Sequence, residues 1–240
     1  MTYVLSDIHG CYEQYRKMLE KIHFADNDVL YVVGDVVDRG PEPMKVLRDM
    51  SMRSNIIPIL GNHDHVAHAI LSRLLLELNE ENIRKHFGHD LENFFMEIST
   101  WTSEDFGGQP TLEGFRKLSM DEKRFMIEYI SEFSLYEIVK AGGKNFILTH
   151  IGLPAGAAPG NLEKFDAYDF TGPDVSIDYG REYFKNIFLV TGHTPTFGIG
   201  EEYRGRIYRA HNHIAIDTGA VFGEVMGCVC LETGEEFYVK

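Results

Sequence analysis

The chain has 240 residues, enough for one large α/β domain and barely enough for two, so we expect a single domain over residues 1–240. Hydrophobic residues make up 44% and charged residues 25%, which is typical of a globular protein and excludes a disordered chain. Asp and Glu number 37 against 23 Lys and Arg, a formal charge of -14 that predicts repulsion of nucleic acids and anionic membranes. We therefore expect no nucleic-acid partner and no membrane partner.

The cysteines and the first residues bear on the cellular compartment. The chain has three cysteines, Cys11, Cys228 and Cys230. This number is small and odd, so the cysteines cannot form a disulfide framework, which favours a reducing compartment. We interpret Cys228 and Cys230 as alternating residues of one strand, because no second metal-binding pair stands at zinc-ribbon spacing. A charged motif begins by Asp7, before a signal peptide could be completed, so we expect a cytoplasmic location.

The first 60 residues alternate short apolar runs with helical patterns. The apolar runs predict strands at Tyr3 to Ser6, Val29 to Val33 and Ile56 to Leu60. Apolar residues at helical spacing follow the first strand up to Ile22, and a second helix is predicted over Pro43 to Met50. This alternation indicates successive βαβ units and hence a parallel sheet.

The middle of the chain reads differently, as a helical insertion from about residue 65 to about 132. Helical patterns run from Ile70 to Leu78 and from Asp121 to Ile130. The Gly107-Gly108-Gln109-Pro110 turn breaks the insertion shortly after Trp101, the only tryptophan. We expect Trp101 to pack in a core, with the rim of a pocket as the alternative role.

Strands return in the last hundred residues. They are predicted at Phe146 to Thr149 and at Phe188 to Thr191. Between them, Pro154 to Gly180 is rich in Gly, Pro, Ala and Asp and is expected to form a long loop over the site. From His213 to Lys240 we expect a terminal hairpin with a Thr233-Gly234 turn.

Five of these predicted strands end in polar side chains. Those side chains are Asp7, His9, Asp35, Asn62, His150 and His193. Functional sites of open α/β sheets lie at the carboxyl ends of the strands, so we expect these groups to lie together. Oxygen donors mixed with imidazoles suit manganese, iron or zinc. If Asp35 bridges two ions, it would hold them about 3.5–4 Å apart, as in two-metal hydrolases, and their charge would attract phosphate despite the acidic surface.

The motifs in these turns resemble those of the metallophosphoesterases, specifically the phosphoprotein phosphatase family with its bacterial and phage-type members. The matching motifs are Asp7-Ile8-His9-Gly10, Gly34-Asp35-Val36-Val37-Asp38-Arg39-Gly40, Gly61-Asn62-His63-Asp64, Thr149-His150 and Gly192-His193-Thr194. The Asp38-Arg39-Gly40 ending is shared with diadenosine tetraphosphate hydrolases. The resemblance implies an α/β fold, a four-layer metallophosphoesterase sandwich with two mixed β-sheets flanked by helices, carrying the helical insertion.

The resemblance also implies roles for individual residues. One metal ion would be held by Asp7, His9 and Asp35, and the other by Asp35, Asn62, His150 and His193. His63 would be the general acid toward the leaving oxygen, with Asp38 orienting its imidazole. Arg39 would grip the phosphate oxygens, together with Asn62. The two divalent ions are expected to be manganese first, with iron, zinc or nickel as alternatives.

Three positions depart from the family pattern. The family has a second phosphate-gripping arginine in the loop region after the fourth motif, and Arg181 is the nearest candidate, with a surface helix residue as its alternative role. The usual His-Ala-Gly is replaced by His150-Ile151-Gly152, and Asp64 stands where a glutamate is common. The late Asp217-Thr218-Gly219 motif is expected to be structural. No departure removes a metal ligand.

We therefore expect a dinuclear-metal-dependent phosphoesterase that hydrolyses phosphomonoesters by attack of a metal-bridging hydroxide, with a serine/threonine protein phosphatase as the first expectation. The alternative is a symmetrical bis(5'-nucleosyl)-tetraphosphatase, so the substrate partner is a phosphorylated protein or a nucleotide. A non-catalytic scaffold of the same fold is disfavoured because the ligands, His63, Asp38 and Arg39 are all present. The metal, the substrate and the oligomeric state stay open.

Overall fold

The computed structural model describes residues 1–77, 79–87 and 91–240. The two β-sheets have five strands each, and both are mixed. The first has the order β10-β9-β1-β2-β3 and the second the order β4-β5-β6-β8-β7. The first sheet is built from β1 (Thr2–Leu5), β2 (Val29–Val33), β3 (Ile56–Ile59), β9 (Met226–Cys230) and β10 (Glu236–Val239). The second sheet is built from β4 (Glu137–Ala141), β5 (Lys144–Leu148), β6 (Ile187–Thr191), β7 (Tyr208–Ala210) and β8 (His213–Ala215).

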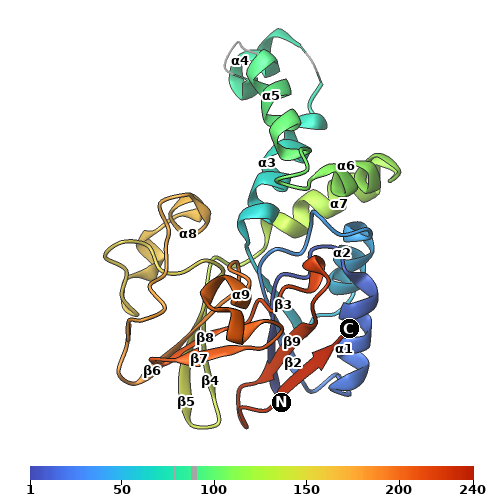
Figure 1. The fold of residues 1–240 in the computed structure, drawn as a ribbon. Helices are drawn as coiled ribbons and strands as arrows, with labels where there is room; N and C mark the ends of the chain where they lie inside the picture. Colours follow the sequence, from blue (N-terminus) through green and yellow to red (C-terminus); the bar gives the residue numbers. More distant parts are fainter. Residues whose placement is uncertain (78, 88–90) are drawn as a thin grey trace.

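The helices fall into three groups along the chain (Figure 1). The first group connects the strands of the first sheet: α1 (Tyr12–Lys21) and α2 (Pro43–Ser51). The second group forms the helical insertion: α3 (Asn62–Leu74), α4 (Glu80–Phe87), α5 (Leu91–Trp101), α6 (Gln109–Arg116) and α7 (Met120–Ser131). The third group is made of short pieces: η1 (Leu162–Lys164), α8 (Ala167–Thr171), α9 (Thr196–Ile199), η2 (Glu201–Tyr203) and η3 (Ala220–Phe222). Among the described residues, no helix has the length and apolar character needed to cross a membrane.

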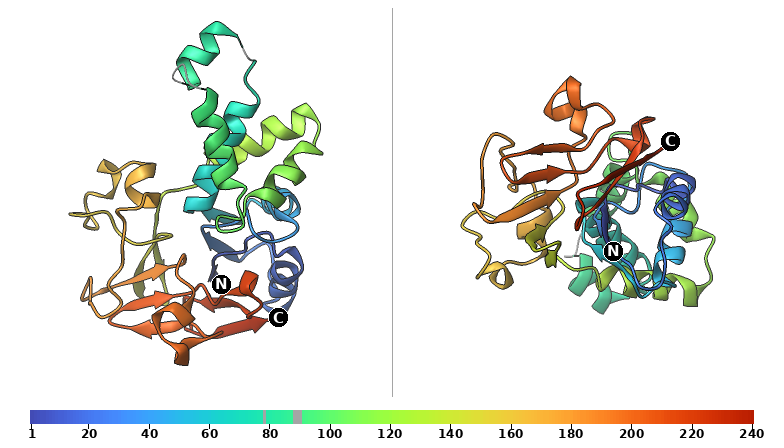
Figure 2. Two further views of the ribbon diagram at one scale, coloured as in Figure 1. Left: turned by 45° about the horizontal axis from the view of Figure 1, so that its top comes forward. Right: turned by 90° about the horizontal axis from the view of Figure 1, so that it is seen from below.

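Alternation along the strands separates two cores. Successive strand residues point to opposite faces, so Val4 packs between the two sheets while Leu5 packs against the helices. The layer between the sheets also contains Val33 and Ile59 from the first sheet and Phe146 from the second. The molecule is therefore a layered sandwich, with α1 and α2 on the outer face of the first sheet (Figures 1 and 2).

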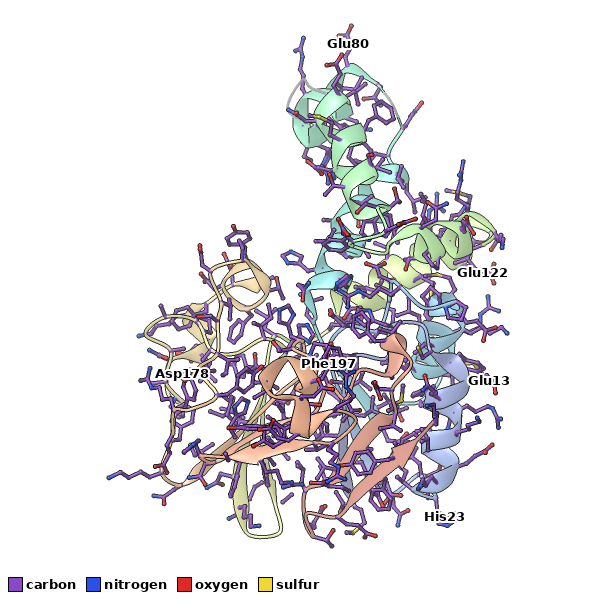
Figure 3. All side chains as sticks on the ribbon, viewed as in Figure 1. Glu13, His23, Glu80, Glu122, Asp178 and Phe197 are labelled. Carbon is purple, nitrogen blue, oxygen red and sulfur yellow. The ribbon has the colours of Figure 1, made fainter. Side chains whose placement is uncertain are left out.

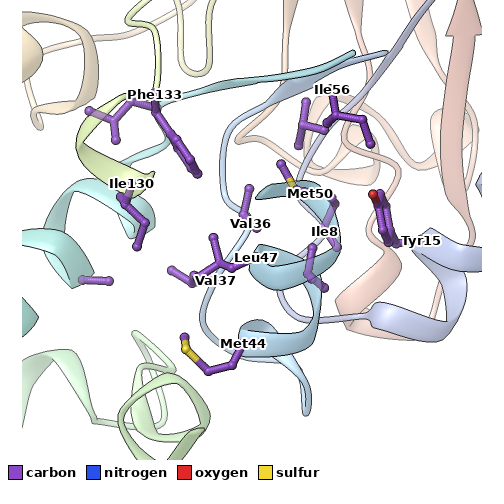
Figure 4. Close-up of a cluster of buried hydrophobic side chains, with 14 of the residues drawn as sticks. Ile8, Tyr15, Val36, Val37, Met44, Leu47, Met50, Ile56, Ile130 and Phe133 are labelled. Atoms are coloured by element: carbon purple, nitrogen blue, oxygen red, sulfur yellow. The ribbon is translucent and has the colours of Figure 1, made fainter. Parts of the chain in front are cut away.

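The core beneath these helices joins the insertion to the rest of the chain. Figure 4 shows Ile8, Leu47 and Met50 beside Ile130 and Phe133, which end and follow α7. All five side chains are buried. The root of the insertion thus shares one hydrophobic core with the first sheet, whereas Glu80 lies at its far tip (Figure 3).

The strands predicted up to Thr191 and the helices α1, α2 and α7 are confirmed, with shifts of one or two residues at their ends. Helix α3 begins at Asn62 directly after β3, so the third polar turn is itself a helix start and the insertion begins three residues earlier than expected. The helical pattern predicted from Ile70 to Leu78 falls on α3, but this helix ends at Leu74, so the prediction runs too far; residue 78 itself lies outside the described residues. Cys228 and Cys230 are buried on one face of β9, as the strand interpretation requires, and both are free.

Three expectations are corrected. Strand β4 is a strand that the sequence did not indicate; it pairs with β5 through the Gly142-Gly143 turn. The region from residue 213 onward is not a hairpin alone, because β8 joins β6 in the second sheet and only β9 and β10 form the hairpin around Thr233-Gly234. The Pro154 to Gly180 segment is not structureless: it contains η1 and α8, and Leu162 and Phe170 pack on the outer face of the second sheet.

Candidate active site

Polar turns from both sheets meet at the carboxyl ends of five parallel strands. Asp7 and His9 follow β1, Asp35 follows β2, and Asn62 begins α3 directly after β3. His150 follows β5 and His193 follows β6 in the second sheet. The six side chains named from the sequence are therefore brought together at one edge of the sandwich.

The backbone of these turns is strained. Six of the residues here have φ angles between +44° and +68°, a region that side chains other than glycine rarely adopt. They are Asp7, His9, Asp35, Asp38, Arg39 and His193. Such positions cost on the order of 1–3 kcal/mol each and persist only where surrounding contacts hold them, which is typical of functional sites.

The donor atoms converge in two groups around Asp35. Its Oδ2 lies 3.5 Å from Nε2 of His9 and 3.2 Å from Nε2 of His150. The Asn62 Oδ1 lies 3.0 Å from Nε2 of His150 and 2.9 Å from Nδ1 of His193. Two sets of side chains could each hold a metal ion, with Asp35 in both: His9, Asp35 and His63, and Asp35, His150 and His193. A carboxylate common to two sets is the arrangement that a bridging ligand requires.

Two of the imidazoles are fixed by their second ring nitrogen. Nδ1 of His9 lies 2.8 Å from the carbonyl oxygen of Val37, and Nδ1 of His150 lies 2.9 Å from that of Val33. When Nδ1 donates to a carbonyl, Nε2 carries the lone pair that faces the centre. This second hydrogen bond is the usual way in which proteins orient a metal-ligating histidine.

Buried negative charge makes the centre suited to cations. Burial raises the pKa of Asp7 well above its ordinary range, and the neighbouring Asp217 adds to this. Burial and Asp35 raise the pKa of Asp64 to about 7, and burial raises that of Asp217 to about 6. Although burial opposes protonation of His150, the Asp35 carboxylate raises its pKa to about 10. Positive charge placed among these carboxylates would relieve their repulsion, so the donor set fits two divalent ions.

Glycines in the turns allow the ligands to approach each other. A Cβ atom on Gly61 would lie 2.2 Å from Oδ1 of Asp35, and one on Gly192 would lie 2.3 Å from Oδ2 of Asp7. Gly61 has an ordinary extended backbone, with φ -90° and ψ 167°, so only the space beside Asp35 demands a glycine there. Its role is steric.

We expect Gly61→Ala to weaken metal binding by about 10–100-fold, the effect usually seen when the support of a ligand is disturbed. The added methyl group would lie 2.2 Å from both the backbone nitrogen and Oδ1 of Asp35, so it must displace the Asp35 turn together with its carboxylate. Titration of metal-free protein with Mn²⁺ by calorimetry measures the result. Gly160→Ala is the matched control, because a Cβ at Gly160 meets nothing within 4 Å. Equal affinities in the two variants would contradict this role of Gly61.

His63 forms a buried pair with Asp38. Its Nδ1 lies 2.9 Å from Oδ2 of Asp38, and the two side chains are 3% and 0% exposed. With Nδ1 bound to the carboxylate, Nε2 is the nitrogen that faces the ligands. The ring stands edge-on to His9, with centroids 4.8 Å apart. His63 is therefore close enough to join a metal group, and its pairing with Asp38 equally suits an acid that delivers a proton from Nε2.

The two arginines named from the sequence lie in different places. Arg39 points into the centre, where Nη1 lies 2.7 Å from Nε2 of His9, and its guanidinium lies 5.4 Å from the ring of Phe222. Arg181 lies in the segment before β6, over the ring of Tyr183, and lines a pocket of about 420 Å³ with Pro154. Among the contacts described for the chain, none joins Arg181 to the ligand set. Figure 3 shows Asp178, which lines the same pocket as Arg181, at the outer side of this segment.

Three residues that the sequence did not mark for catalysis surround the site. Asp64 is fully buried and accepts hydrogen bonds from the backbone N–H groups of Val36, Val37 and Gly61, so it ties the second turn to the third. Trp101 and Thr111, from the insertion, both donate to Asp38. The sequence points to this region only through Trp101, the only tryptophan, which precedes the Gly107-Gly108 turn and whose alternative role is the rim of a pocket.

A family model described as calcineurin-like phosphoesterase matches residues 2–217. Among curated proteins, the chain is 49% identical over 65 residues to a symmetrical bis(5'-nucleosyl)-tetraphosphatase of Buchnera aphidicola, covering 26% of this chain and 24% of that protein. The matches thus span about a quarter of the length of these first relatives. A longer match is to the asymmetrical bis(5'-nucleosyl)-tetraphosphatase PrpE of Oceanobacillus iheyensis, 26% identical and covering 92% of this chain and 84% of that protein.

Solved structures share the fold at low sequence identity. One is a protein whose assignment as a diadenosine tetraphosphatase is itself provisional, with a TM-score of 0.63, 16% identity, and coverage of 99% of this chain and 92% of that one. Another is a protein serine/threonine phosphatase of Saccharomyces cerevisiae, with a TM-score of 0.55, 12% identity, and coverage of 100% and 80%. At these identities the likeness concerns the fold alone.

Proposed function

Since the chain belongs to the calcineurin-like phosphoesterase family, we propose that it is a two-metal hydrolase of phosphate anhydrides and esters, with dinucleoside tetraphosphates as its first substrate class. The observation that supports the reaction is the gathering of two His/Asp groups around Asp35, one of which contains His63, the partner of Asp38. Bound divalent ions would supply positive charge for the phosphoryl oxygens and acidify the attacking water. Among manganese, iron, zinc and nickel, we propose manganese as the bound metal.

The side chains of the protein divide the remaining work. We propose that Arg39 leaves its contact with His9 and binds two phosphoryl oxygens, for which its planar fork is suited. His63 donates a proton from Nε2 to the oxygen that leaves phosphorus, and Asp38 keeps the ring aligned through Nδ1. Asp7, His9, Asp35, Asn62, His150 and His193 hold the metal ions. Arg181 is the candidate for a second phosphate contact, which requires the segment before β6 to approach the metal site.

Dinucleoside tetraphosphates stand ahead of phosphoproteins for two reasons. The relative that matches nearly the whole chain bears the name of an asymmetrical tetraphosphatase. A pocket of about 550 Å³ also lies between α3 and α5, and one of its lining residues, Phe106, contacts His63. It is lined by Val66, Ile70, Trp101 and Phe106, and the Phe106 ring lies 4.3 Å from the ring of His63. An apolar, aromatic pocket beside the leaving-group side suits a nucleobase.

Phosphoproteins are the second candidate, because the fold is shared with a protein serine/threonine phosphatase. The test compares diadenosine tetraphosphate, a phosphothreonine peptide and p-nitrophenyl phosphate with Mn²⁺, Fe²⁺, Zn²⁺ or Ni²⁺ added. We expect kcat/KM for the dinucleotide to exceed that for the peptide by at least about 10²-fold. Release of ADP alone would identify symmetrical cleavage, and ATP with AMP asymmetrical cleavage. A preference for the peptide would overturn our ordering in favour of a protein phosphatase.

Filling the pocket between α3 and α5 should affect the dinucleotide alone. Ala69 is exposed and lines this pocket, so we expect Ala69→Trp to raise KM for diadenosine tetraphosphate by about tenfold or more, the loss of roughly one aromatic contact. KM for p-nitrophenyl phosphate should stay unchanged, since that substrate does not reach the pocket. Ala25→Trp, before the start of β2 and so at the opposite end of the sheet, is the control. Equal KM changes in both variants would contradict a base-binding pocket.

A further inference from the structure

The carboxylate of Asp38 is held by three side-chain donors: His63 at the start of the helical insertion, and Trp101 and Thr111 from its later helices α5 and α6. Its Oδ2 accepts from Nε1 of Trp101 at 2.9 Å, besides facing His63, and its Oδ1 accepts from the hydroxyl of Thr111 at 2.7 Å. The Thr111 hydroxyl in turn accepts from the backbone N–H of Asp38 at 2.9 Å. Trp101 is 1% exposed and Thr111 and Asp38 are fully buried, so these bonds are shielded from water.

The same segment holds the backbone that carries Asp38. Asp38 and Arg39 have φ angles of +68° and +63°, and each has its backbone N–H bonded to the insertion. The N–H of Arg39 donates to the carbonyl oxygen of Gly107 at 2.7 Å, while that of Asp38 is taken by Thr111. Two left-handed residues in succession need such external contacts in order to persist.

Residues 101–111 of the insertion also pack closely against His63 and the Asp38-Arg39 turn. The ring of Phe106 covers the ring of His63, with centroids 4.3 Å apart. A Cβ on Gly107 would lie 2.6 Å from Cγ of Arg39, and one on Gly108 would lie 2.4 Å from the indole of Trp101. Residues 101–111 therefore follow the shape of the Asp38-Arg39 turn with little free space.

We propose that Trp101 and Thr111 are positioning residues of the reaction: they hold Asp38 so that His63 presents Nε2 to the leaving oxygen. This inference rests on the proposed function, and it makes the insertion part of the catalytic apparatus as well as a wall of the substrate pocket. Because a carboxylate has two oxygens and rotates about its Cβ–Cγ bond, losing a donor on either oxygen frees it to turn away from His63. The metal ligands are not involved.

Leaving-group dependence separates this role from a structural one. Phenyl phosphate needs a proton at its leaving oxygen far more than p-nitrophenyl phosphate does, because phenol is the weaker acid. We expect Trp101→Phe and Thr111→Val to lower kcat for phenyl phosphate by about tenfold and to leave KM for both substrates unchanged. The kcat for p-nitrophenyl phosphate should fall less than about threefold. Thr111→Ser, which keeps the hydroxyl, should restore the wild-type ratio.

Matched controls and a double variant exclude a general loosening of the insertion. Phe115→Leu removes buried volume from α6, and Thr102→Val removes a hydroxyl that donates to the carbonyl oxygen of Ile98; neither side chain has a described contact with Asp38. Neither should change the ratio of the two kcat values. Adding Trp101→Phe to Asp38→Asn should have no further effect, because the two act through one group.

Two results would overturn the positioning role while leaving the proposed function intact. One is a folded Trp101→Phe variant that keeps the wild-type kcat ratio, and the other is an equal fall of kcat for both substrates. Failure of the wild-type protein to hydrolyse any phosphate ester or anhydride with added metal would instead overturn the proposed function, and this inference with it.

Discussion

Replacement of His63 by asparagine is expected to lower kcat for diadenosine tetraphosphate or phenyl phosphate by about 10²–10⁴-fold, the usual contribution of a positioned general acid. The imidazole is buried against Asp38, and its Nε2 faces the ligand group. Without it the leaving oxygen departs as an anion. Steady-state kinetics with metal-saturated enzyme measure the effect, and p-nitrophenyl phosphate should lose much less activity because its leaving group needs little protonation.

This experiment also decides between an acid and a ligand at His63. His68→Asn is the matched control, since His68 is a half-buried histidine on the same helix α3. If His63 is an acid, His63→Asn should bind two metal ions per chain as the wild type does, while its kcat depends steeply on the leaving group. A lost metal ion, or equal losses for good and poor leaving groups, would make His63 a ligand instead.

Replacement of Asp35 by asparagine is expected to reduce kcat/KM by about 10²–10³-fold for every substrate, the order of magnitude seen when electrostatic stabilisation of a transition state is removed. The carboxylate lies in both candidate metal groups, and its Oδ2 faces both His9 and His150. An amide has the same shape but no charge, so it cannot offset two divalent ions. Elemental analysis of the purified variant should find at most one metal ion per chain.

Asp28→Asn provides the control for Asp35→Asn, because both are buried aspartates at the ends of one strand. Asp28 precedes β2 and binds the N-terminal ammonium group, whereas Asp35 follows β2 at the site. Asp28→Asn should keep its metal ions and its activity. Dialysis of the wild-type protein against a chelator should reproduce the loss seen with Asp35→Asn, and added Mn²⁺ should reverse it. Full activity in metal-free protein would contradict a metal-dependent reaction.

The candidate site was largely predictable because its signals are local. Each candidate ligand stands within a few residues after an apolar strand, in a turn or, for Asn62, at the start of a helix, so the strand and the candidate ligand are close in the sequence. The edge of the sheet then brings the turns together, whichever order the strands take. Asp7, Asp35 and His150 could thus be named without knowing that β5 belongs to a different sheet from β1 and β2.

Other features depended on pairings that leave no local trace. Strand β4 has a mixed pattern and is a strand because it pairs with β5, while β7 and β8 are only three residues long. The Pro154 to Gly180 segment gained its order from burying Leu162 and Phe170 on the second sheet. Tertiary burial decided these elements, as it commonly overrides weak local preference.

The side chains of the candidate site could be named from the chain alone: the strand-end aspartates, asparagine and histidines, and the turn that carries Asp38 and Arg39. How those groups are held depends on the folded structure. Trp101 and Thr111 reach Asp38 across 63 and 73 residues of chain, and Asp64 binds N–H groups of Val36 and Val37 across 28 and 27 residues. A ligand in a strand-end turn is marked by its neighbours in the sequence, whereas a hydrogen-bond partner so distant is fixed only when the chain has folded.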